Sequence, residues 1–353
     1  MTAKTTVCSA LQADLLGSTA SSLLVARADN SPSVEDNSVA GRRKRRANGL
    51  RLYHQVWKAA NDLFFDPSRL EDWAQWEHCY DGRIRSVEGA VQLANEMLAT
   101  LQDKYTELSK EDDTSSAREN VVSTQILPKN IGYLRLVDFN QSTTADQVRR
   151  GLLQLRMCES IILDLRGNLG GYIEQALDCA SLFLARGTVV TYEQRIFRSG
   201  GVRTVQYTLR PSGFVKHVIS GETDRVIGRR RRHQCAVSAR TPVVVLVDGE
   251  TASSAEILSA ALRDNNRAVL IGEPTFGKGI GQSFRKMHND YDLAITTFRV
   301  ITPSGNWRGD GHLNKSPLRP DVIVKGRGRI YRSSLVRDAQ LYAAFRRLGG
   351  SLD

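Results

Sequence analysis

The chain has 353 residues, of which 41% are hydrophobic and 25% charged, a composition typical of a globular protein rather than a disordered or collagen-like one. At about 150 residues per domain, this length suggests roughly two folding units. No stretch approaches the ~18 uncharged apolar residues of a membrane-spanning helix, so we do not expect an integral membrane protein. The five cysteines are scattered and form no Cys-x-x-Cys pair, which indicates neither a zinc ribbon nor a disulfide framework.

The net charge of +11 comes mainly from two basic runs, Arg42–Arg46 and Arg229–Arg232. Such runs could contact an anionic surface or an acidic partner. No aromatic interleaving or nucleic-acid motif accompanies them, so we favour solvated segments and no nucleic-acid partner.

The first 48 residues are rich in Ser, Ala, Thr and Asn and lack a sustained apolar period. We therefore expect a disordered basic leader over residues 1–48. Its best apolar piece, residues 23–26, is shorter than the ~7 to 15 residues of a signal-peptide core. The compartment and the oligomeric state are not determined by the sequence.

Helical spacing of apolar residues predicts a small N-terminal helical region over residues 49–125. Apolar side chains recur at three- and four-residue steps from Val87 to Leu101, and Ser86 is a suitable N-cap.

Beyond Ile131, short unbroken runs of Val, Ile and Leu alternate with helix-like segments. The runs at 161–163, 243–247 and 268–271 suit strands that are buried on both faces. This β-α-β rhythm predicts an α/β fold with a largely parallel sheet and helical cover. We place this core at residues 126–328.

Three further elements complete the predicted organisation. Residues 283–287 and 291–300 should form an antiparallel hairpin. The stretch from about 197 to 240 is strand-like at first and then basic, and is interpreted as an insertion. A C-terminal helix is expected within residues 329–353.

The first segment that could carry chemistry is residues 247–257, where a buried strand ends in small and hydroxyl residues and a helix begins. A nucleophile there would be held rigidly, and the helix N-terminus would offer N–H donors to an oxyanion. Ser253-x-x-Glu256 also fits a helix capping box, and on this segment alone capping is the favoured interpretation.

The second segment, residues 272–282, carries Lys278 among glycines. Burial can depress the pKa of an ammonium group, and a neutral lysine can take the proton from a serine hydroxyl. Gln282, four residues on, has an amide that could hold the amine in one rotamer. The alternatives are a surface lysine or a phosphate contact, but Gly279 stands where a Walker A loop needs Ser or Thr.

The third segment, residues 163–171, also ends a buried strand and carries the paired glycines Gly170 and Gly171. Glycines allow the close backbone approach that an oxyanion hole requires. In isolation, a plain strand-to-helix connection would be the default.

Together and in this order, the three segments resemble the signature of the carboxyl-terminal processing peptidases, or tail-specific proteases. The family's Gly-Glu-Pro-Thr-Phe-Gly-Lys-Gly loop is intact at residues 272–279. Its Ser-Ala-Ser-Ala-Ser-Glu pattern aligns through Glu256, and its Asp-Leu-Arg-x-Asn-Pro-Gly-Gly pattern aligns with residues 164–171. Leu169 stands where that last pattern has proline.

The resemblance implies a fold related to the crotonase and Clp-protease superfamily and a Ser-Lys serine endopeptidase. Ser253 would be the nucleophile, Lys278 the general base and Gln282 the residue that orients it. The N–H groups of Ser254 and of Gly170 or Gly171 would meet the oxyanion.

Family members usually carry a PDZ domain before the first core strand, where it binds a substrate C-terminus. Here Ile131 follows Thr106 by only 25 positions, fewer than the ~50 residues of a small domain. We expect no PDZ domain at this place, so recognition of free C-termini does not carry over.

We therefore predict a serine-type endopeptidase that acts on a polypeptide substrate through an acyl-enzyme, with no cofactor and no metal. The six histidines form no His-x-x-x-His pair, and no Gly-x-Ser-x-Gly elbow is present. The alternative is a catalytically inactive peptide-binding or scaffold protein that retains the peptidase core. An acyl-CoA enzyme is a more distant third, because its chemistry does not explain the lysine loop.

Overall fold

The computed structural model describes residues 38–110, 120–196, 201–220, 223–230, 233, 235–305, 317–326 and 337–350. The chain divides into two compact units. The core unit contains Thr114–Gly281 and Thr297–Asp353, and the helical unit contains the described residues up to Lys110 together with Gln282–Thr296.

The core unit is built on a six-stranded sheet with the strand order β13-β10-β9-β4-β3-β2. The strands are β2 (Val122–Leu127), β3 (Ile131–Leu136), β4 (Ser160–Asp164), β9 (Val243–Val247), β10 (Val269–Gly272) and β13 (Val322–Ile323). All neighbours are parallel except β2 and β3, which are antiparallel. The three apolar runs of the sequence are strands β4, β9 and β10, so the predicted parallel sheet is confirmed.

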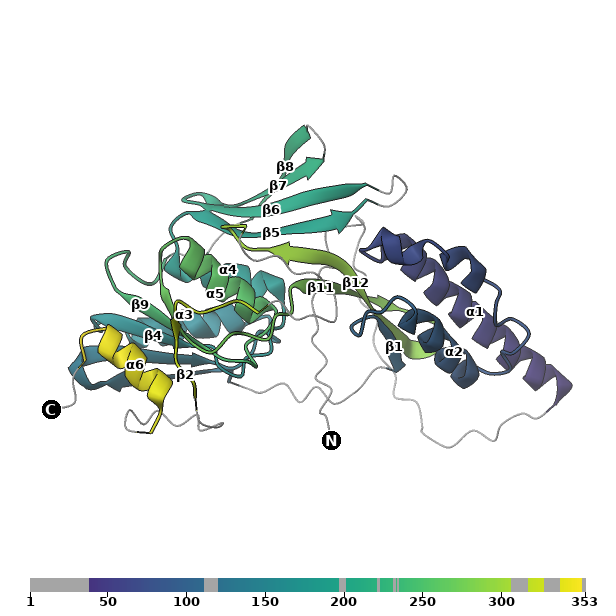
Figure 1. The fold of residues 1–353 in the computed structure, drawn as a ribbon, viewed down its shortest axis with the longest axis horizontal. Coiled ribbons are helices and arrows are strands. Elements are labelled where there is room, and N and C mark those ends of the chain that lie inside the picture. Colours follow the sequence, from purple (N-terminus) through teal and green to yellow (C-terminus); the bar gives the residue numbers. More distant parts are fainter. Residues whose placement is uncertain are drawn as a thin grey trace, which may run out of the picture. The chain divides into compact units, whose positions relative to one another are not determined.

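Helices cover both faces of this sheet (Figure 1). They are α3 (Thr144–Gln154), α4 (Ile173–Phe183) and α5 (Ser254–Asp264) on one face and α6 (Ala339–Arg347) on the other. Phe345 and Leu341 of α6 pack against Ile162 and Val244. A parallel sheet covered on both faces explains the unbroken apolar runs, and it confirms the predicted α/β class.

A second, antiparallel sheet of the core unit contains the segment expected to be an insertion. Strands β5 (Gly187–Arg195), β6 (Val202–Arg210), β7 (Gly213–Ser220) and β8 (Thr223–Arg230) pair in chain order, and β5 also pairs with residues 298–301 of β12 (Tyr291–Ile301). Helices α4 and α5 lie between the two sheets (Figure 1). The second basic run was expected in a solvated loop, but its first two residues, Arg229 and Arg230, form the end of strand β8.

The helical unit has its own hydrophobic core. Its elements are α1 (Val39–Leu63), the 3-10 turns η1 (Pro67–Leu70) and η2 (Trp73–Trp76), α2 (Val87–Ala99), β1 (Glu107–Lys110), and parts of β11 (Ile280–Lys286) and β12 (Tyr291–Ile301). Leu52 and Tyr53 of α1 pack with Leu98 of α2 and Leu293 of β12. Ser86 caps α2 by accepting the Gly89 N–H at 3.2 Å, as predicted.

The predicted hairpin is present as β11 and β12, which pair with each other and are joined by residues 288–290. Its outer part belongs to the helical unit, because β1 pairs antiparallel with residues 291–294 of β12. The sequence does not predict the pairing of β1 with β12, since the paired residues are separated by more than 180 positions.

The predicted boundaries differ from the structure at two places. Helix α1 begins at Val39, where the Ser38 hydroxyl accepts the Gly41 N–H at 3.0 Å, so the basic run Arg42–Arg46 is helical and does not belong to a leader. A capped helix can carry a charged first half because only its later turns bury apolar side chains. The boundary expected at residue 125 falls inside β2. Residues 1–37 lie outside the described residues.

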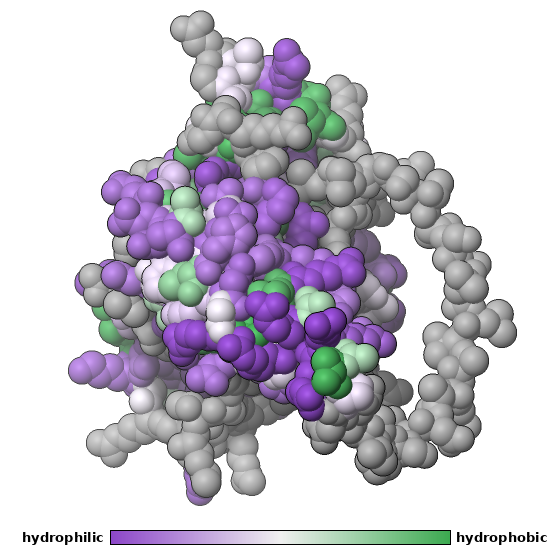
Figure 2. Space-filling view, turned by 90° about the vertical axis from the view of Figure 1, so that its right-hand side faces the viewer, coloured by the Kyte–Doolittle hydropathy of each residue, from purple (hydrophilic) through white to green (hydrophobic). Residues whose placement is uncertain are grey.

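None of the helices in the described part of the chain is both long and apolar enough to cross a membrane. The face of the molecule in Figure 2 is largely hydrophilic, with hydrophobic residues only in small groups.

A buried ionic network joins strand β4 to helix α6. Arg166 donates to Asp164 through Nε at 2.9 Å and Nη2 at 2.7 Å, and to Asp338 through Nη1 at 2.9 Å. Tyr133 donates its hydroxyl to Asp164 Oδ2 at 2.6 Å. Desolvation opposes the charge of Arg166, but its hydrogen bonds with the two carboxylates raise the pKa of the guanidinium. The Asp164-Leu165-Arg166 part of the motif is therefore structural.

Arg166→Met should lower the free energy of unfolding by about 3–5 kcal/mol, because it removes the nearest countercharge of two buried carboxylates and leaves Asp164 only the more distant Arg135 at 3.6 Å. Urea denaturation measures the change. The control Arg149→Met removes a half-exposed partner of Asp146 and should lower the free energy of unfolding by about 1 kcal/mol or less. Equal losses in the two variants would contradict this role for Arg166.

Candidate active site

The three segments that could carry chemistry follow three neighbouring strands. The turn with Gly170 follows β4, the turn with Ser253 follows β9, and the loop with Lys278 follows β10. These strands are parallel, so their carboxyl ends meet at one edge of the sheet. In open α/β sheets, ligands bind outside the carboxyl ends of the strands.

Hydrogen bonds from side chain and backbone connect the Ser253 turn with the glycine turn. Asp248 Oδ1 accepts the N–H groups of Gly167 and Thr251, each at 3.0 Å. The Ala252 N–H donates to the Asn168 carbonyl at 2.9 Å. Asn168 is fully buried, and its Nδ2 donates to the Leu136 carbonyl at 3.0 Å. The two turns are therefore held as one piece of backbone.

Ser253 lies at the junction of this turn and helix α5 with φ 54° and ψ −119°. A positive φ is strained for a residue that carries a β-carbon. The side chain is only partly buried, and the next residue begins the helix. Strain of this kind is concentrated at functional sites, where the surrounding structure maintains it.

Glu256, one turn into α5, connects the serine with the lysine loop. Its Oε2 accepts the Ser253 N–H at 2.8 Å and the Lys278 N–H at 2.9 Å. Its Oε1 accepts the Gly277 N–H at 2.8 Å and the Thr275 hydroxyl at 2.5 Å. The capping box predicted for Ser253 and Glu256 is present, and the same carboxylate also anchors the lysine loop.

Glu256 is fully buried. Burial raises the pKa of this carboxyl to about 7, although its hydrogen bonds with Thr275 and the three N–H groups favour the ionised form. The group therefore changes charge near neutral pH.

The loop that carries Lys278 is fixed at several points of the core unit. Gly272 has φ 138°, and a β-carbon there would lie 1.9 Å from the Val247 carbonyl oxygen, so only glycine fits. The Phe276 N–H donates to the Thr251 carbonyl at 2.9 Å. The side chain of Lys278 is buried, with 9% of its surface exposed, which is unusual for a lysine.

The glycine turn lies directly against Ser253. A β-carbon on Gly170 would be 2.8 Å from the Ser253 β-carbon and 3.0 Å from the Ser254 nitrogen. The Gly170 N–H already donates to Asn168 Oδ1 at 2.9 Å. The N–H groups of Gly171 and Ser254 have no acceptor among the residues that the structure describes. These two groups are therefore the better candidates for oxyanion donors.

Gln282 is buried in strand β11, and its Nε2 donates to the Tyr105 carbonyl at 2.5 Å. Both of these residues belong to the helical unit. The structure thus brings together Ser253, Ser254, Gly170 and Gly171, and it connects them to the Lys278 backbone through Glu256.

Sequence reasoning missed two kinds of residue here. It assigned Glu256 to capping alone, and it assigned no role to Asn168 or Asp248. It also assigned no role to His54, His78 and Asp81 of the helical unit, whose possible ligand atoms lie within 4.8 Å of one another.

Comparison with known proteins gives several related sequences. Carboxy-terminal processing protease CtpA of Bacillus subtilis is 29% identical over 216 residues, which cover 60% of this chain and 39% of the relative. Carboxyl-terminal-processing peptidase 2, chloroplastic, of Arabidopsis thaliana is 35% identical over 176 residues, which cover 49% of this chain and 29% of the relative. The chain therefore spans well under two thirds of the length of these curated relatives.

Two solved structures are similar in fold. The photosystem II D1 C-terminal processing protease has a TM-score of 0.58 at 19% identity, with 86% of this chain and 98% of that chain covered. A lipoprotein from Streptococcus agalactiae has a TM-score of 0.60 at 14% identity, with 85% and 96% covered.

Residues 130–324, more than half of the chain, match the description of peptidase family S41. This match contains the parallel strands, the strained serine, the glycine turn and the lysine loop described above. On that basis, this chain belongs to peptidase family S41.

Proposed function

We propose that the protein is a serine-type endopeptidase in which Ser253 is the nucleophile and Lys278 is the general base. The observation that carries the proposal is the shared acceptor Glu256 Oε2. The two backbone nitrogens bound to this oxygen lie within about 6 Å of each other. Backbones this close allow the two side chains to reach the hydrogen-bond distance that proton transfer requires.

In the proposed reaction, Lys278 in its neutral form accepts the proton of the Ser253 hydroxyl while Oγ attacks a peptide carbonyl. The lysine then returns this proton to the leaving amine, and the C–N bond breaks to leave an acyl-enzyme. Water hydrolyses the ester and restores Ser253. The burial of Lys278 supports this role, since desolvation favours the neutral amine.

The negative charge that develops on the carbonyl oxygen would be met by the N–H groups of Ser254 and Gly171. The Ser254 donor lies at the N-terminus of α5, where the helix dipole also favours an anion. The bond from Gly170 to Asn168 favours Gly171 over Gly170 as the second donor.

The substrate is proposed to be a polypeptide, cleaved near its C-terminus as the names of the relatives suggest. We propose that substrates are recognised without a PDZ domain between Thr106 and Ile131, because only 25 positions separate these two residues.

Ser253→Ala and Lys278→Ala should each abolish cleavage of an unfolded protein by the purified chain. The matched controls are Ser283→Ala and Lys286→Ala on strand β11, which remove the same groups and should leave the rate within about twofold. Mass spectrometry of the wild type after brief mixing should detect an acyl adduct on the peptide that contains Ser253.

Cleavage that persists in the Ser253 variant would overturn the assignment of the nucleophile. A folded wild type with no cleavage and no adduct would instead favour the inactive peptide-binding alternative.

A second prediction concerns the pH dependence of stability. The pKa of Glu256 is raised from 4.5 to about 7 in the folded protein, so the native state holds this proton more tightly than the unfolded chain. The resulting stabilisation is complete below about pH 4.5 and is lost as the pH rises through about 7, a change of about 3 kcal/mol. Glu256→Gln cannot titrate and should not show this loss.

The measurement is urea denaturation of the wild type and the Gln variant at pH 5 and pH 8. Between these values the wild type should lose stability relative to the variant. Glu159→Gln, at an exposed position, is the control and should follow the wild type. Parallel pH profiles for the wild type and Glu256→Gln would refute the raised pKa.

A further inference from the structure

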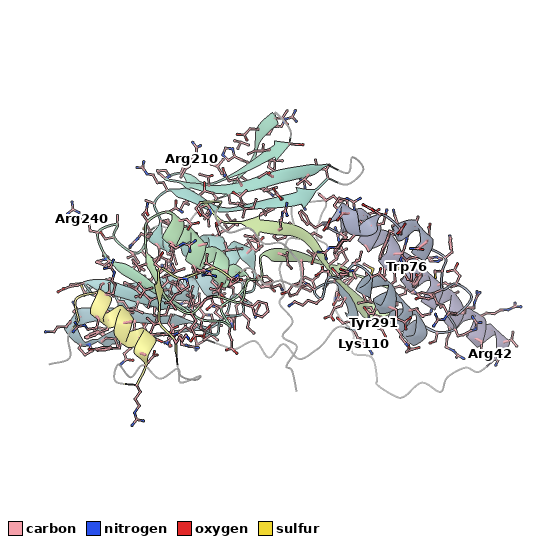
Figure 3. The ribbon with its side chains drawn as sticks, viewed as in Figure 1. Arg42, Trp76, Lys110, Arg210, Arg240 and Tyr291 are labelled. Carbon is pink, nitrogen blue, oxygen red and sulfur yellow. The ribbon has the colours of Figure 1, made fainter. Side chains whose placement is uncertain are left out.

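We propose that His54, His78 and Asp81 form a binding site for a divalent transition metal, with Zn²⁺ as the ion that best suits the ligands. His54 lies on helix α1, and the other two lie in the loop between η2 and α2. Trp76, labelled in Figure 3, ends η2 just before this loop. This site belongs to the helical unit alone and is independent of the proposed peptidase chemistry.

The three side chains already converge on one point. His54 Nε2 lies 2.8 Å from Asp81 Oδ1, and His78 Nδ1 lies 3.0 Å from Asp81 Oδ2. All three ligand atoms lie within 4.8 Å of one another. Tetrahedral zinc with ligands at about 2.0–2.2 Å holds neighbouring ligand atoms about 3.4 Å apart. A small rotation of His78, whose side chain is 69% exposed, would be enough to close the site.

The chemistry of the ligands selects the class of ion. Two imidazole nitrogens and one carboxylate oxygen suit zinc and its transition-metal neighbours, whereas magnesium and calcium prefer oxygen ligands only. In the metal-free arrangement, each histidine can present a ring N–H to Asp81, and the two protons occupy the space between the ligands. A metal ion would replace these protons, because it requires deprotonated nitrogens.

Packing and hydrogen bonds fix helix α1 next to the loop that carries His78 and Asp81. Tyr53, the residue before His54, is fully buried and donates its hydroxyl to the Trp76 carbonyl at 2.5 Å. The loop closes on itself through the Asp81 N–H, which donates to the His78 carbonyl at 3.2 Å. The two histidine rings meet edge to face with centroids 5.1 Å apart. Helix and loop therefore bring the three ligands close together in the metal-free protein.

Two arginines lie near the site and oppose a cation. Arg46 Nη2 donates to the Asp81 carbonyl at 3.2 Å, and the Arg83 guanidinium lies over the Tyr80 ring at 4.9 Å from its centroid. Both are held by groups other than the ligand atoms. The Asp81 carboxylate supplies the opposite charge at the shortest range.

The consequence of binding would be a cross-link between helix α1 and a loop more than twenty residues further along the chain. Only the folded protein holds the three ligands together, so the ion would stabilise the folded state. Three protein ligands and one water molecule would complete a four-coordinate site. The same ligands suit Co²⁺, whose bound form can be followed by its visible absorption spectrum.

The test is isothermal titration of the untagged full chain with zinc chloride, with metal content measured after dialysis. We expect one ion per chain for the wild type. His78→Asn and Asp81→Asn should bind at least about 100-fold more weakly, since even the loss of a residue that supports a ligand weakens affinity about 10–100-fold. The Co²⁺ spectrum should disappear in the same variants.

The matched control is His217→Asn. His217 pairs with Asp224 at 3.2 Å on strands β7 and β8, and this pair belongs to no cluster of three ligands among the described residues. The control should bind zinc like the wild type.

A wild type that takes up no zinc would overturn the proposal and leave the cluster as two ordinary histidine–carboxylate pairs. Unchanged affinity in His78→Asn would overturn it equally. His78 is largely exposed, so its replacement should not unfold the unit, and circular dichroism verifies this. None of these measurements depends on proteolysis, so the result stands apart from the test of Ser253.

Discussion

The candidate active site depends on one buried carboxylate. Glu256 accepts hydrogen bonds from the backbone of the serine turn and from the backbone of the lysine loop, and its own helix begins between them. A charge at this depth is costly, and four donors offset only part of that cost. The carboxylate links the backbones of two loops that are separated in the chain by helix α5 and strand β10.

The parallel sheet explains why a single carboxylate can have this effect. Strands β4, β9 and β10 are neighbours, so the segments that follow them emerge side by side. Asp248 and Asn168 join the first two segments, and Glu256 joins the second to the third. The sheet provides the coarse placement, and these hydrogen bonds provide the fine placement that acid–base chemistry requires.

Much of the fold and part of the site could be predicted from local pattern. The apolar runs that became β4, β9 and β10, the Ser86 cap and the hairpin all have signals within a few residues of one another. The pairing of β1 with β12 and the meeting of His54 with Asp81 could not be predicted, because their partners are distant in the chain. Glu256 has a local signal as a capping residue. Its contacts with Gly277 and Lys278 have no such signal, because these partners lie more than twenty positions further along the chain, beyond strand β10.

The backbone of Ser253 has a consequence for which residues can stand at this position. With φ at 54°, glycine would adopt the conformation with less strain than any residue that has a β-carbon. A sequence optimised only for folding would therefore place glycine here. The proposed role of Ser253 as nucleophile would account for serine at this position, because that chemistry needs the hydroxyl. Under that proposal, the backbone strain at Ser253 lowers stability for the sake of the reaction.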